Sequence, residues 1–230
     1  MTGTIVNVAA IVLGALAGLL FRKGLPERVR HTIMQGLGLA VLLIGLQMSM
    51  QTGQALVVVV SLVLGGLTGE LLKIEERLDR LGKWVDVKVG GATGDAGRAF
   101  ITTSLIYCVG AMAIMGSIED GLNGNHQILF TKAALDGVSA ALFASAMGPG
   151  VILSAVPVFL YQGAITMLAS SAKGFLGAAA VLEMSATGGL LIIGIGLNIL
   201  NIKEIKVGNL LPAIFYAIPL AVWLPIIIPS

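Results

Sequence analysis

The chain has 230 residues, of which 57% are hydrophobic and 11% are charged, and its formal net charge is +2. Soluble domains carry about 25% charged residues, so this composition excludes a soluble globular protein and indicates a membrane protein with several spans. The chain has a single cysteine and two histidines. They allow no intramolecular disulfide and no cluster with the spacing of metal ligands, and we expect no cofactor.

Apolar segments long enough to cross a bilayer follow one another along the chain. They cover residues 4–21, 32–48, 54–72, 99–117, 128–147, 151–170, 175–199 and 207–228. We therefore predict an all-α integral membrane protein with about eight transmembrane helices, forming one membrane domain over residues 1–230. The first segment is expected to be a span and not a removable signal peptide, because Arg22 and Lys23 follow the apolar run instead of preceding it.

The basic residues predict the orientation of the spans. Most of the 14 Lys and Arg residues fall in two connecting segments, residues 22–31 and 73–98. The positive-inside rule places both segments in the cytoplasm, so that both termini face outward and Lys173 lies in an outer loop. This parity requires a tight hairpin at Gly148-Pro149-Gly150, because a kink within one long helix would reverse every span that follows.

The polar segment 73–89 predicts a helix that does not cross the membrane. Its apolar residues recur at helical spacing with charges between them, at Ile74, Leu78, Leu81 and Val85. Two interpretations fit this pattern equally well. The segment is either an amphipathic helix on the cytoplasmic membrane surface or a solvated linker helix packed on its own protein.

A shift of the chain by 97 residues aligns several glycines without a gap. It brings Gly24-Leu25 onto Gly121-Leu122, Gly53 onto Gly150 and Gly66 onto Gly163. The alignment predicts a 3+3 inverted-topology repeat, with halves at residues 1–72 and 98–170 and two further helices at 175–228, as is typical of secondary transporters. The alternative is a chance match between glycine-rich apolar helices.

Ionisable residues inside a bilayer are costly unless they are paired or face water, so they are candidates for function. Lys132 and Asp136 lie one turn apart in a span, at a spacing that permits an ion pair, and Glu183 lies within another span. Asp136 and Glu183 are the candidate sites for coupling to a proton or cation, because desolvation disfavours a charged carboxylate. The alternative for Lys132 and Asp136 is an interhelical lock in which the two charges neutralise each other.

Small and polar residues in the same spans extend the candidate site. Ser185, Gly188 and Gly189 interrupt an apolar helix, which predicts either an unwound stretch that exposes backbone groups to a solute or close helix packing. Gln162 follows a proline by about a turn and is expected to line a polar pathway, while Asn198 is expected either to join it or to bond neighbouring helices.

Glu119 and Asp120 close the predicted fourth span at its outer end. They are expected either to form an acidic mouth that attracts cations or to be ordinary solvated loop acids.

Catalysis is not expected. His31 and His126 lie at span ends, Cys108 has no neighbouring base, and no protease-like arrangement of serine and histidine or of paired aspartates appears.

Several stretches resemble one family of bacterial multi-pass membrane proteins of unknown function, the family that includes YqgA and YdfK. They are Gly3-Thr4-Ile5-Val6-Asn7, Gly110 to Leu122, Lys132-Ala133-Ala134-Leu135-Asp136-Gly137 and Tyr161-Gln162-Gly163. The resemblance covers essentially the whole chain and implies a protein of the bacterial cytoplasmic membrane. It implies no activity and assigns no functional residue.

The residues therefore favour secondary transport or conduction of a small polar or charged solute, with a proton or cation as the coupling ion. The competing hypothesis is a membrane scaffold or regulatory protein that transports nothing, in which residues 73–89 contact another protein. The expected partners are the lipid bilayer and a small solute or cation. No nucleic acid is expected, and the sequence leaves a homo-oligomer open.

Overall fold

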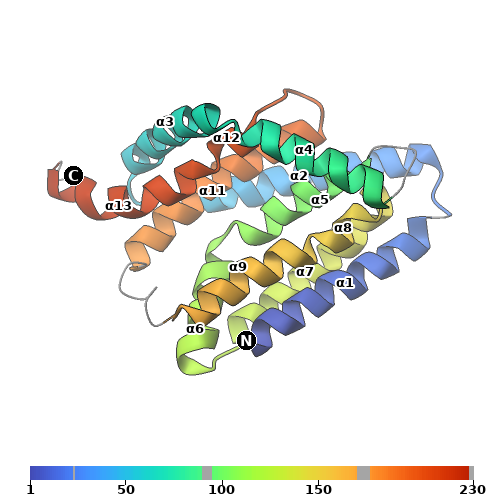
Figure 1. Ribbon diagram of the computed structural model, residues 1–230, viewed down its shortest axis with the longest axis horizontal. Coiled ribbons are helices and arrows are strands. Elements are labelled where there is room, and N and C mark those ends of the chain that lie inside the picture. Colours follow the sequence, from blue (N-terminus) through green and yellow to red (C-terminus); the bar gives the residue numbers. More distant parts are fainter. Residues whose placement is uncertain (23, 90–94, 170–176, 228–230) are drawn as a thin grey trace. The chain divides into compact units, whose positions relative to one another are not determined.

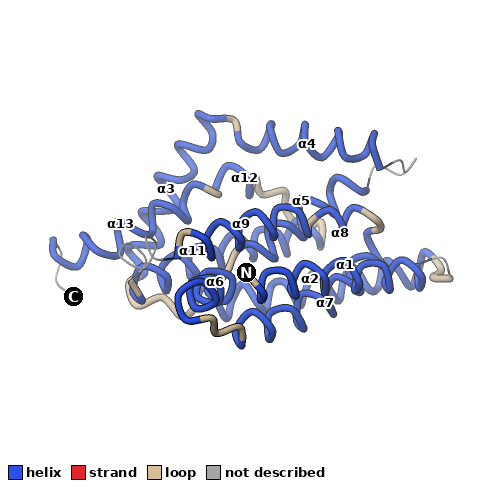
Figure 2. Tube along the Cα trace, turned by 60° about the horizontal axis from the view of Figure 1, so that its bottom comes forward, coloured by secondary structure: helices blue, strands red, loops and turns tan. Residues whose placement is uncertain are grey.

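The structure is a computed structural model, and it describes residues 1–22, 24–89, 95–169 and 177–227. All secondary structure in these ranges is helical (Figures 1 and 2), which confirms the all-α prediction. The helices are α1 (Thr2–Arg22), α2 (Glu27–Ser49), α3 (Ala55–Leu72), α4 (Ile74–Val89), α5 (Asp95–Cys108), α6 (Ala111–Asn123), α7 (Gln127–Met147), α8 (Gly150–Leu153), α9 (Ala155–Met167), α11 (Ala178–Ile199), α12 (Val207–Leu210) and α13 (Pro212–Ile227). The predicted outer position of Lys173 lies outside the described residues.

Within these ranges, six helical stretches are long and apolar enough to cross a membrane. They are α1, α2, α3, α7, α11 and the stretch Gly150–Met167 that α8 and α9 form together. The predicted fourth span is instead a pair, α5 and α6, bent by 61°, and it gives a seventh crossing only if the pair counts as one span. The predicted eighth span is represented by a shorter apolar helix, Val207–Trp223.

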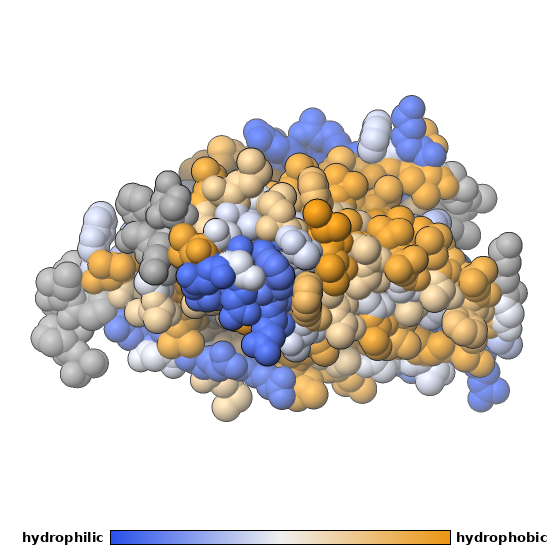
Figure 3. Space-filling view, turned by 90° about the horizontal axis from the view of Figure 1, so that it is seen from below, coloured by the Kyte–Doolittle hydropathy of each residue, from blue (hydrophilic) through white to orange (hydrophobic). Residues whose placement is uncertain are grey.

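Large apolar side chains cover the outer surfaces of these helices. Leu20 on α1 is 77% exposed and Leu71 on α3 is 83% exposed. Figure 3 shows hydrophobic side chains over much of one face of the protein. Such a surface is unfavourable in water, but in a bilayer the same side chains meet lipid tails. The outer surface therefore suits a membrane environment.

The chain divides into two compact units that interleave along the sequence. Unit 1 comprises Met1–Leu37, Leu78–Cys108 and Met112–Ser170, and unit 2 comprises Gly38–Arg77, Val109–Ala111 and Ser171–Ser230. Each unit draws on both predicted repeat halves, so the units are not the two copies of the repeat. The inverted repeat stays a prediction.

Unit 1 is built around close packing of α1 against α7. A Cβ atom at Gly14 would clash with the carbonyl of Gly137, and one at Gly18 with the carbonyl of Ala141. Residue numbers rise together along both helices, from Gly14 against Gly137 to Gly18 against Ala141. The helices α1 and α7 therefore run parallel (Figure 1). Glycine at these positions lets the two backbones approach closely.

The chain reverses direction between α7 and α8, as the sequence predicted. Gly148 adopts a φ of 102°, a conformation that favours glycine, and α8 begins two residues later. Asp136 before the turn and Gln162 after it both contact Asn7 on α1, which requires α9 to run back alongside α7. The turn is therefore a hairpin and not a kink in one long helix.

Unit 2 packs its helices in antiparallel pairs through glycines. Gly65 of α3 contacts Ala213, and Gly69 contacts Asn209. The residue numbers rise on α3 and fall on the partner segment, so the two run antiparallel. Gly45 of α2 likewise approaches the backbone of α11 near Ile193. Within each unit, the relative directions of the helices agree with the alternation predicted from the basic residues.

The glycines of α11 do not interrupt that helix, so the predicted unwinding at Gly188 and Gly189 is wrong. The helix is continuous from Ala178 to Ile199. A Cβ atom at Gly188 would meet the side chain of Val109, and one at Gly189 would meet the backbone of α2. These glycines serve close helix packing, which was the alternative that the sequence left open.

The helical break occurs instead between α5 and α6. The chain leaves α5 at Cys108 and enters α6 at Ala111, with a φ of 147° at Gly110. A β-carbon is disfavoured in this conformation, so glycine permits the break. The helix therefore breaks at residues 109–110, within the segment that was predicted as the fourth span.

Candidate functional site

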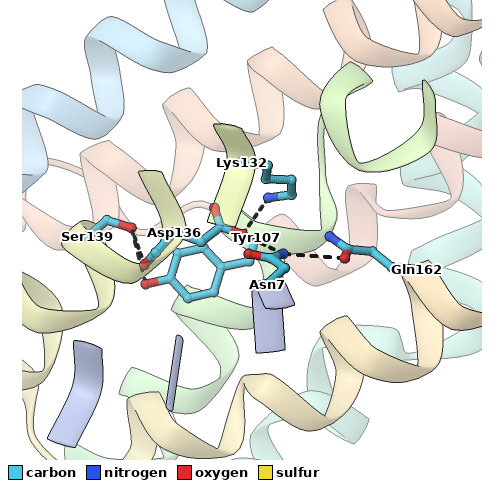
Figure 4. Close-up of polar contacts among 6 residues, drawn as sticks. All are labelled: Asn7, Tyr107, Lys132, Asp136, Ser139 and Gln162. Atoms are coloured by element: carbon cyan, nitrogen blue, oxygen red, sulfur yellow. Dashed lines mark hydrogen bonds and ion pairs between the residues drawn. The ribbon is translucent and has the colours of Figure 1, made fainter. Parts of the chain in front are cut away.

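Four polar side chains from three helices meet inside unit 1 (Figure 4). Lys132 Nζ lies 2.6 Å from Asp136 Oδ2, both on α7. Asn7 of α1 donates from Nδ2 to Asp136 Oδ2 at 3.0 Å and to Gln162 Oε1 of α9 at 3.3 Å. We call these four residues, Asn7, Lys132, Asp136 and Gln162, the polar cluster.

The polar cluster is buried within the protein. Lys132 and Asp136 are each 7% exposed, and Asn7 and Gln162 are fully buried. Lys132 therefore does not extend its ammonium group to water, although its long side chain could reach an interface from near a helix end. A buried ion pair costs substantial desolvation energy, which good geometry and additional hydrogen bonds must offset.

Two atoms of the polar cluster have no hydrogen-bond partner among the described residues. They are the acceptor Asn7 Oδ1 and the donor Gln162 Nε2. Buried polar groups are nearly always paired with protein or with water, so such atoms require an explanation. They leave one acceptor and one donor unpaired beside an ion pair with no net charge.

The broken span borders the polar cluster. Tyr107, in the last turn of α5, lies with its hydroxyl 3.4 Å from the hydroxyl of Ser139, and Ser139 also donates to the carbonyl oxygen of Asp136 at 3.0 Å. Figure 4 shows Tyr107 and Ser139 beside the ion pair. A discontinuous helix beside buried polar groups is the arrangement that transporters use at their binding sites.

Glu183 belongs to unit 2, where it contacts the start of α3. Its carboxylate accepts hydrogen bonds from the backbone N–H of Gly53 at 2.8 Å, from that of Gln54 at 3.1 Å and from the hydroxyl of Thr52 at 2.5 Å. The first N–H groups of a helix have no partner within the helix, and they attract negative charge. Glu183 therefore caps the N-terminus of a neighbouring helix.

The other candidates in α11 have separate surroundings. Ser185 is buried, and its hydroxyl has no hydrogen-bond partner among the described residues. Asn198 exchanges two hydrogen bonds of 2.8 Å with the backbone of Ile205 and so secures the turn after α11. None of the described hydrogen bonds or ion pairs joins these residues to the polar cluster.

Asp120 is not part of a solvated acidic mouth, because it is buried in α6. Its carboxylate lies 2.6 Å from the imidazole of His126 and 3.0 Å from the N-terminal ammonium group, and it accepts from the backbone N–H of Gly3 at 3.2 Å. Glu119 instead accepts a hydrogen bond from Asn123, one turn on. The N-terminal ammonium group and Gly3 come from a segment remote in sequence, so the sequence around Asp120 gave no sign of its burial.

Two contacts were not predicted from the sequence: that of Asn7 with the polar cluster and that of residues 52–54 with Glu183. A lone asparagine in a span usually bonds neighbouring helices and carries no further signal. Its occurrence in Gly3-Thr4-Ile5-Val6-Asn7, one of the stretches that carries the family resemblance, was the available hint.

Comparison with known proteins settles the family. Residues 2–222 match the family described as "Protein of unknown function (DUF554)". The chain belongs to this family. It is 31% identical to "Uncharacterized membrane protein YdfK" of Bacillus subtilis (strain 168), over 93% of each chain, and 30% identical to "Uncharacterized protein YqgA" of Escherichia coli (strain K12), over 96% of this chain and 97% of that protein. No solved structure matches the chain.

The family relationship and the apolar helices support the same coarse conclusion. One relative is named as a membrane protein. The described residues form six long apolar helical stretches with large apolar side chains on their outer surfaces. This member of the family is therefore an integral membrane protein. The printed descriptions of the relatives name no substrate and no reaction.

Proposed function

We propose that the protein is a secondary transporter or permease for a small polar or charged solute, coupled to a proton or cation at Asp136. The observation that carries this proposal is the polar cluster, with its buried ion pair and its unpartnered donor and acceptor atoms. Charged residues at bilayer depth are costly, and they commonly mark the paths of ions and solutes.

The ion pair gives a physical route to coupling. While Asp136 is ionised, its Oδ2 atom holds both Lys132 and the amide of Asn7. Protonation of the carboxylate removes the charge that attracts the ammonium group, and Lys132 then needs another acceptor within the protein. A solute with an acceptor group can supply it, so solute binding and protonation favour the same state.

The break between α5 and α6 supplies an element that could change between two arrangements. It leaves the helical hydrogen-bond ladder interrupted at residues 109–110, next to Tyr107. A change at this point would alter the surroundings of Ser139 and of the adjacent ion pair. We assign the broken span to the gating of the polar cluster.

Glu183 has a different role in this proposal. Its carboxylate already receives three hydrogen bonds at the start of α3, which hold it in place there. We therefore assign proton or cation coupling to Asp136, and to Glu183 the fixing of the loop before α3. Ser185, Gly188 and Gly189 then belong to the packing around that helix.

We propose the cytoplasmic membrane of a bacterium as the location, with residues 22–31 and 73–98 inside and both termini outside. The bacterial relatives support the location, and the positive-inside rule supports the orientation. We propose no enzymatic activity and no nucleic-acid partner.

A scaffold that transports nothing is the alternative, and the saturated bonding of Glu183 favours it. If Asn7 and the Lys132–Asp136 pair likewise only held α1, α7 and α9 together, the unpartnered amide atoms would simply hold structural water. The two hypotheses differ in whether Asp136 controls a flux or only the stability of the fold.

Flux measurements on purified protein in lipid vesicles test the proposal. Vesicles loaded with a pH-sensitive dye are challenged with pools of amino acids, organic acids, sugars and inorganic cations. We expect one pool to drive a proton or cation flux with the wild type, and we expect Asp136→Asn to abolish it. Glu183→Gln and the control Leu135→Ala, whose side chain is 59% exposed on the same helix, should retain the flux if folded. No flux with any pool, together with an Asp136→Asn variant altered only in thermal stability, would contradict transport.

A further inference from the structure

Buried polar side chains continue from the polar cluster along the contact between α1 and α9. Thr4 lies three residues before Asn7 on α1, and Thr166 lies four residues after Gln162 on α9, so each pair shares one face of its helix. The hydroxyl oxygens of Thr4 and Thr166 are 3.5 Å apart, and both residues are buried. The two helices therefore bring a pair of hydroxyls together about one turn from the paired amides.

Asp120 of α6 lies next to the two threonines. A Cβ atom at the following residue, Gly121, would clash with the carbonyl of Thr166. The Asp120 carboxylate also accepts from the backbone N–H of Gly3, the neighbour of Thr4. None of the Asp120 side chain is exposed. Asp120 therefore extends the series of buried polar groups beyond the threonines.

His126 connects this series to the protein surface. Its Nδ1 atom lies 2.6 Å from the Asp120 carboxylate, and its side chain is 30% exposed. The residue directly precedes α7, and its ring packs beside that of Phe130. The series thus begins at a partly exposed imidazole and ends at the buried Asp136, within unit 1. We call its members, His126, Asp120, Thr4, Thr166, Asn7 and Gln162, the polar row.

The threonines of the polar row differ from other buried hydroxyls of unit 1. Thr103 donates to the carbonyl of Ala99 at 2.7 Å, and Ser154 donates to that of Val151 at 2.6 Å. Such local bonds satisfy a hydroxyl within its own segment. The hydroxyls of Thr4 and Thr166 instead face each other across two helices, at a distance that makes a weak hydrogen bond.

We propose that the polar row conducts protons between His126 and Asp136, carried by water molecules that hydrogen-bond to its side chains. This inference rests on the proposed function, in which Asp136 is the coupling residue. Buried polar atoms are nearly always paired with protein or with water. Asn7 Oδ1 and Gln162 Nε2, fully buried and without a partner among the described residues, are the groups that such water contacts beside Asp136. In the proposed orientation, the row opens to the outside.

The proton transfer balances along the row. A hydronium ion at the His126 end gives a proton to the first water, each water passes one proton on as it receives one, and the last donates to the Asp136 carboxylate. That carboxylate becomes a neutral carboxylic acid. The titratable groups around Asp136 are Lys132 on its own helix and Tyr107 and Cys108 at the end of α5. Those around Asp120 are His126 and the N-terminal ammonium group.

Time-resolved infrared spectroscopy of the full chain in lipid nanodiscs tests the proposal. The C=O stretching band of protonated Asp136 is identified by its absence from Asp136→Asn, and its growth after a rapid drop in pH measures how fast protons arrive. We expect Thr4→Val/Thr166→Val to slow this growth by about tenfold, because water in the row loses hydrogen-bonding partners. His126→Gln, a single change at the partly exposed end, should slow it as well.

The matched control is Thr103→Val/Ser154→Ala, which removes two buried hydroxyls of unit 1 outside the polar row. Its rate should equal that of the wild type. The final amplitude of the band should be the same in all these variants, because each retains Asp136. Unchanged helical content and thermal unfolding verify that each variant is folded.

Three results would overturn the proposal. Wild-type rates in both Thr4→Val/Thr166→Val and His126→Gln would reject the route and leave Asp136 as the coupling residue. Equal slowing by the control variant would show a general effect of lost hydroxyls. The absence of the band from the wild type at every pH would reject both the route and the proposed role of Asp136.

Discussion

Lys132 and Asp136 are both buried, and each neutralises the charge of the other. The proposed coupling depends on this pair. Replacing Lys132 with methionine keeps much of the side-chain volume but leaves Asp136 without its positive partner. We expect Lys132→Met to lower the free energy of unfolding by about 3–5 kcal/mol, the usual effect of breaking a buried pair. Reversible unfolding in mixed detergent micelles measures this loss.

The matched control for Lys132→Met is the double variant Lys132→Met/Asp136→Leu, which removes both charges. Much of the lost stability should return, because no isolated charge remains. Equal stability of the single and the double variant would show that the pair is not electrostatically coupled. Flux should be absent from the double variant if Asp136 is the coupling residue.

Glu183 offers a contrasting case, in which a carboxylate is held by backbone N–H groups and a hydroxyl instead of a cation. Glu183→Gln keeps an acceptor oxygen but removes the negative charge at the start of α3. We expect it to cost about 1–2 kcal/mol of unfolding free energy. Glu204→Gln, at an exposed position of the same unit, should change stability by less than about 0.5 kcal/mol. Equal effects of the two variants on thermal unfolding would contradict the capping role.

The sequence alone singled out Lys132, Asp136, Gln162 and Glu183 as candidates, because ionisable and amide groups in apolar spans stand out from their neighbours. It could not identify their partners. Asn7 is separated from Asp136 by 129 residues and Thr52 from Glu183 by 131, so only the packing of the helices brings them together. Spacing within one helix predicted the Lys132–Asp136 pair, since residues four apart lie on one face.

Glycines in the helices occupy two kinds of position. Some lie in close contact with a neighbouring helix, and others have open space around them. Gly14 of α1 lies against the backbone of α7, whereas Gly36 of α2 has nothing within 4 Å of an added Cβ. We expect Gly14→Ala to destabilise the protein by about 1–3 kcal/mol, because α1 and α7 must move apart. Gly36→Ala should be neutral or stabilise by up to about 1 kcal/mol, since alanine favours a helix.

Thermal unfolding of the two glycine variants side by side checks this contrast. If Gly14→Ala were as stable as Gly36→Ala, α1 and α7 would not pack as described.

The different roles of glycine also explain why the predicted break in α11 was wrong. Gly188 and Gly189 serve packing and Gly110 serves a helix break, yet the three share one residue type, and only the neighbouring helices and the backbone conformation distinguish them.

For the whole molecule, composition and hydrophobic periodicity were sufficient to predict an all-helical membrane protein. The hairpin at Gly148 was predicted from charge distribution, which a kinked helix would have contradicted. Two predicted spans differ, because length and apolarity do not reveal a bend of 61° after Cys108 or the shorter apolar helix Val207–Trp223. The interleaving of the two units depends on contacts between distant segments, which no local pattern encodes.

In the proposed transport cycle, water and solute reach the polar cluster, and chemical labelling of Gln162→Cys measures whether they do. Replacement of the single native cysteine, Cys108→Ala, gives a background in which a membrane-impermeant, hydrophilic thiol reagent reports on one position at a time. Leu160→Cys, on the same helix at a position 63% exposed on the apolar surface, is the control for a lipid-facing site. The account predicts that Gln162→Cys reacts with the reagent in vesicles whereas Leu160→Cys does not. If Gln162→Cys in folded protein reacts no faster than Leu160→Cys, the result contradicts a hydrated pathway. The polar cluster would then be a structural lock.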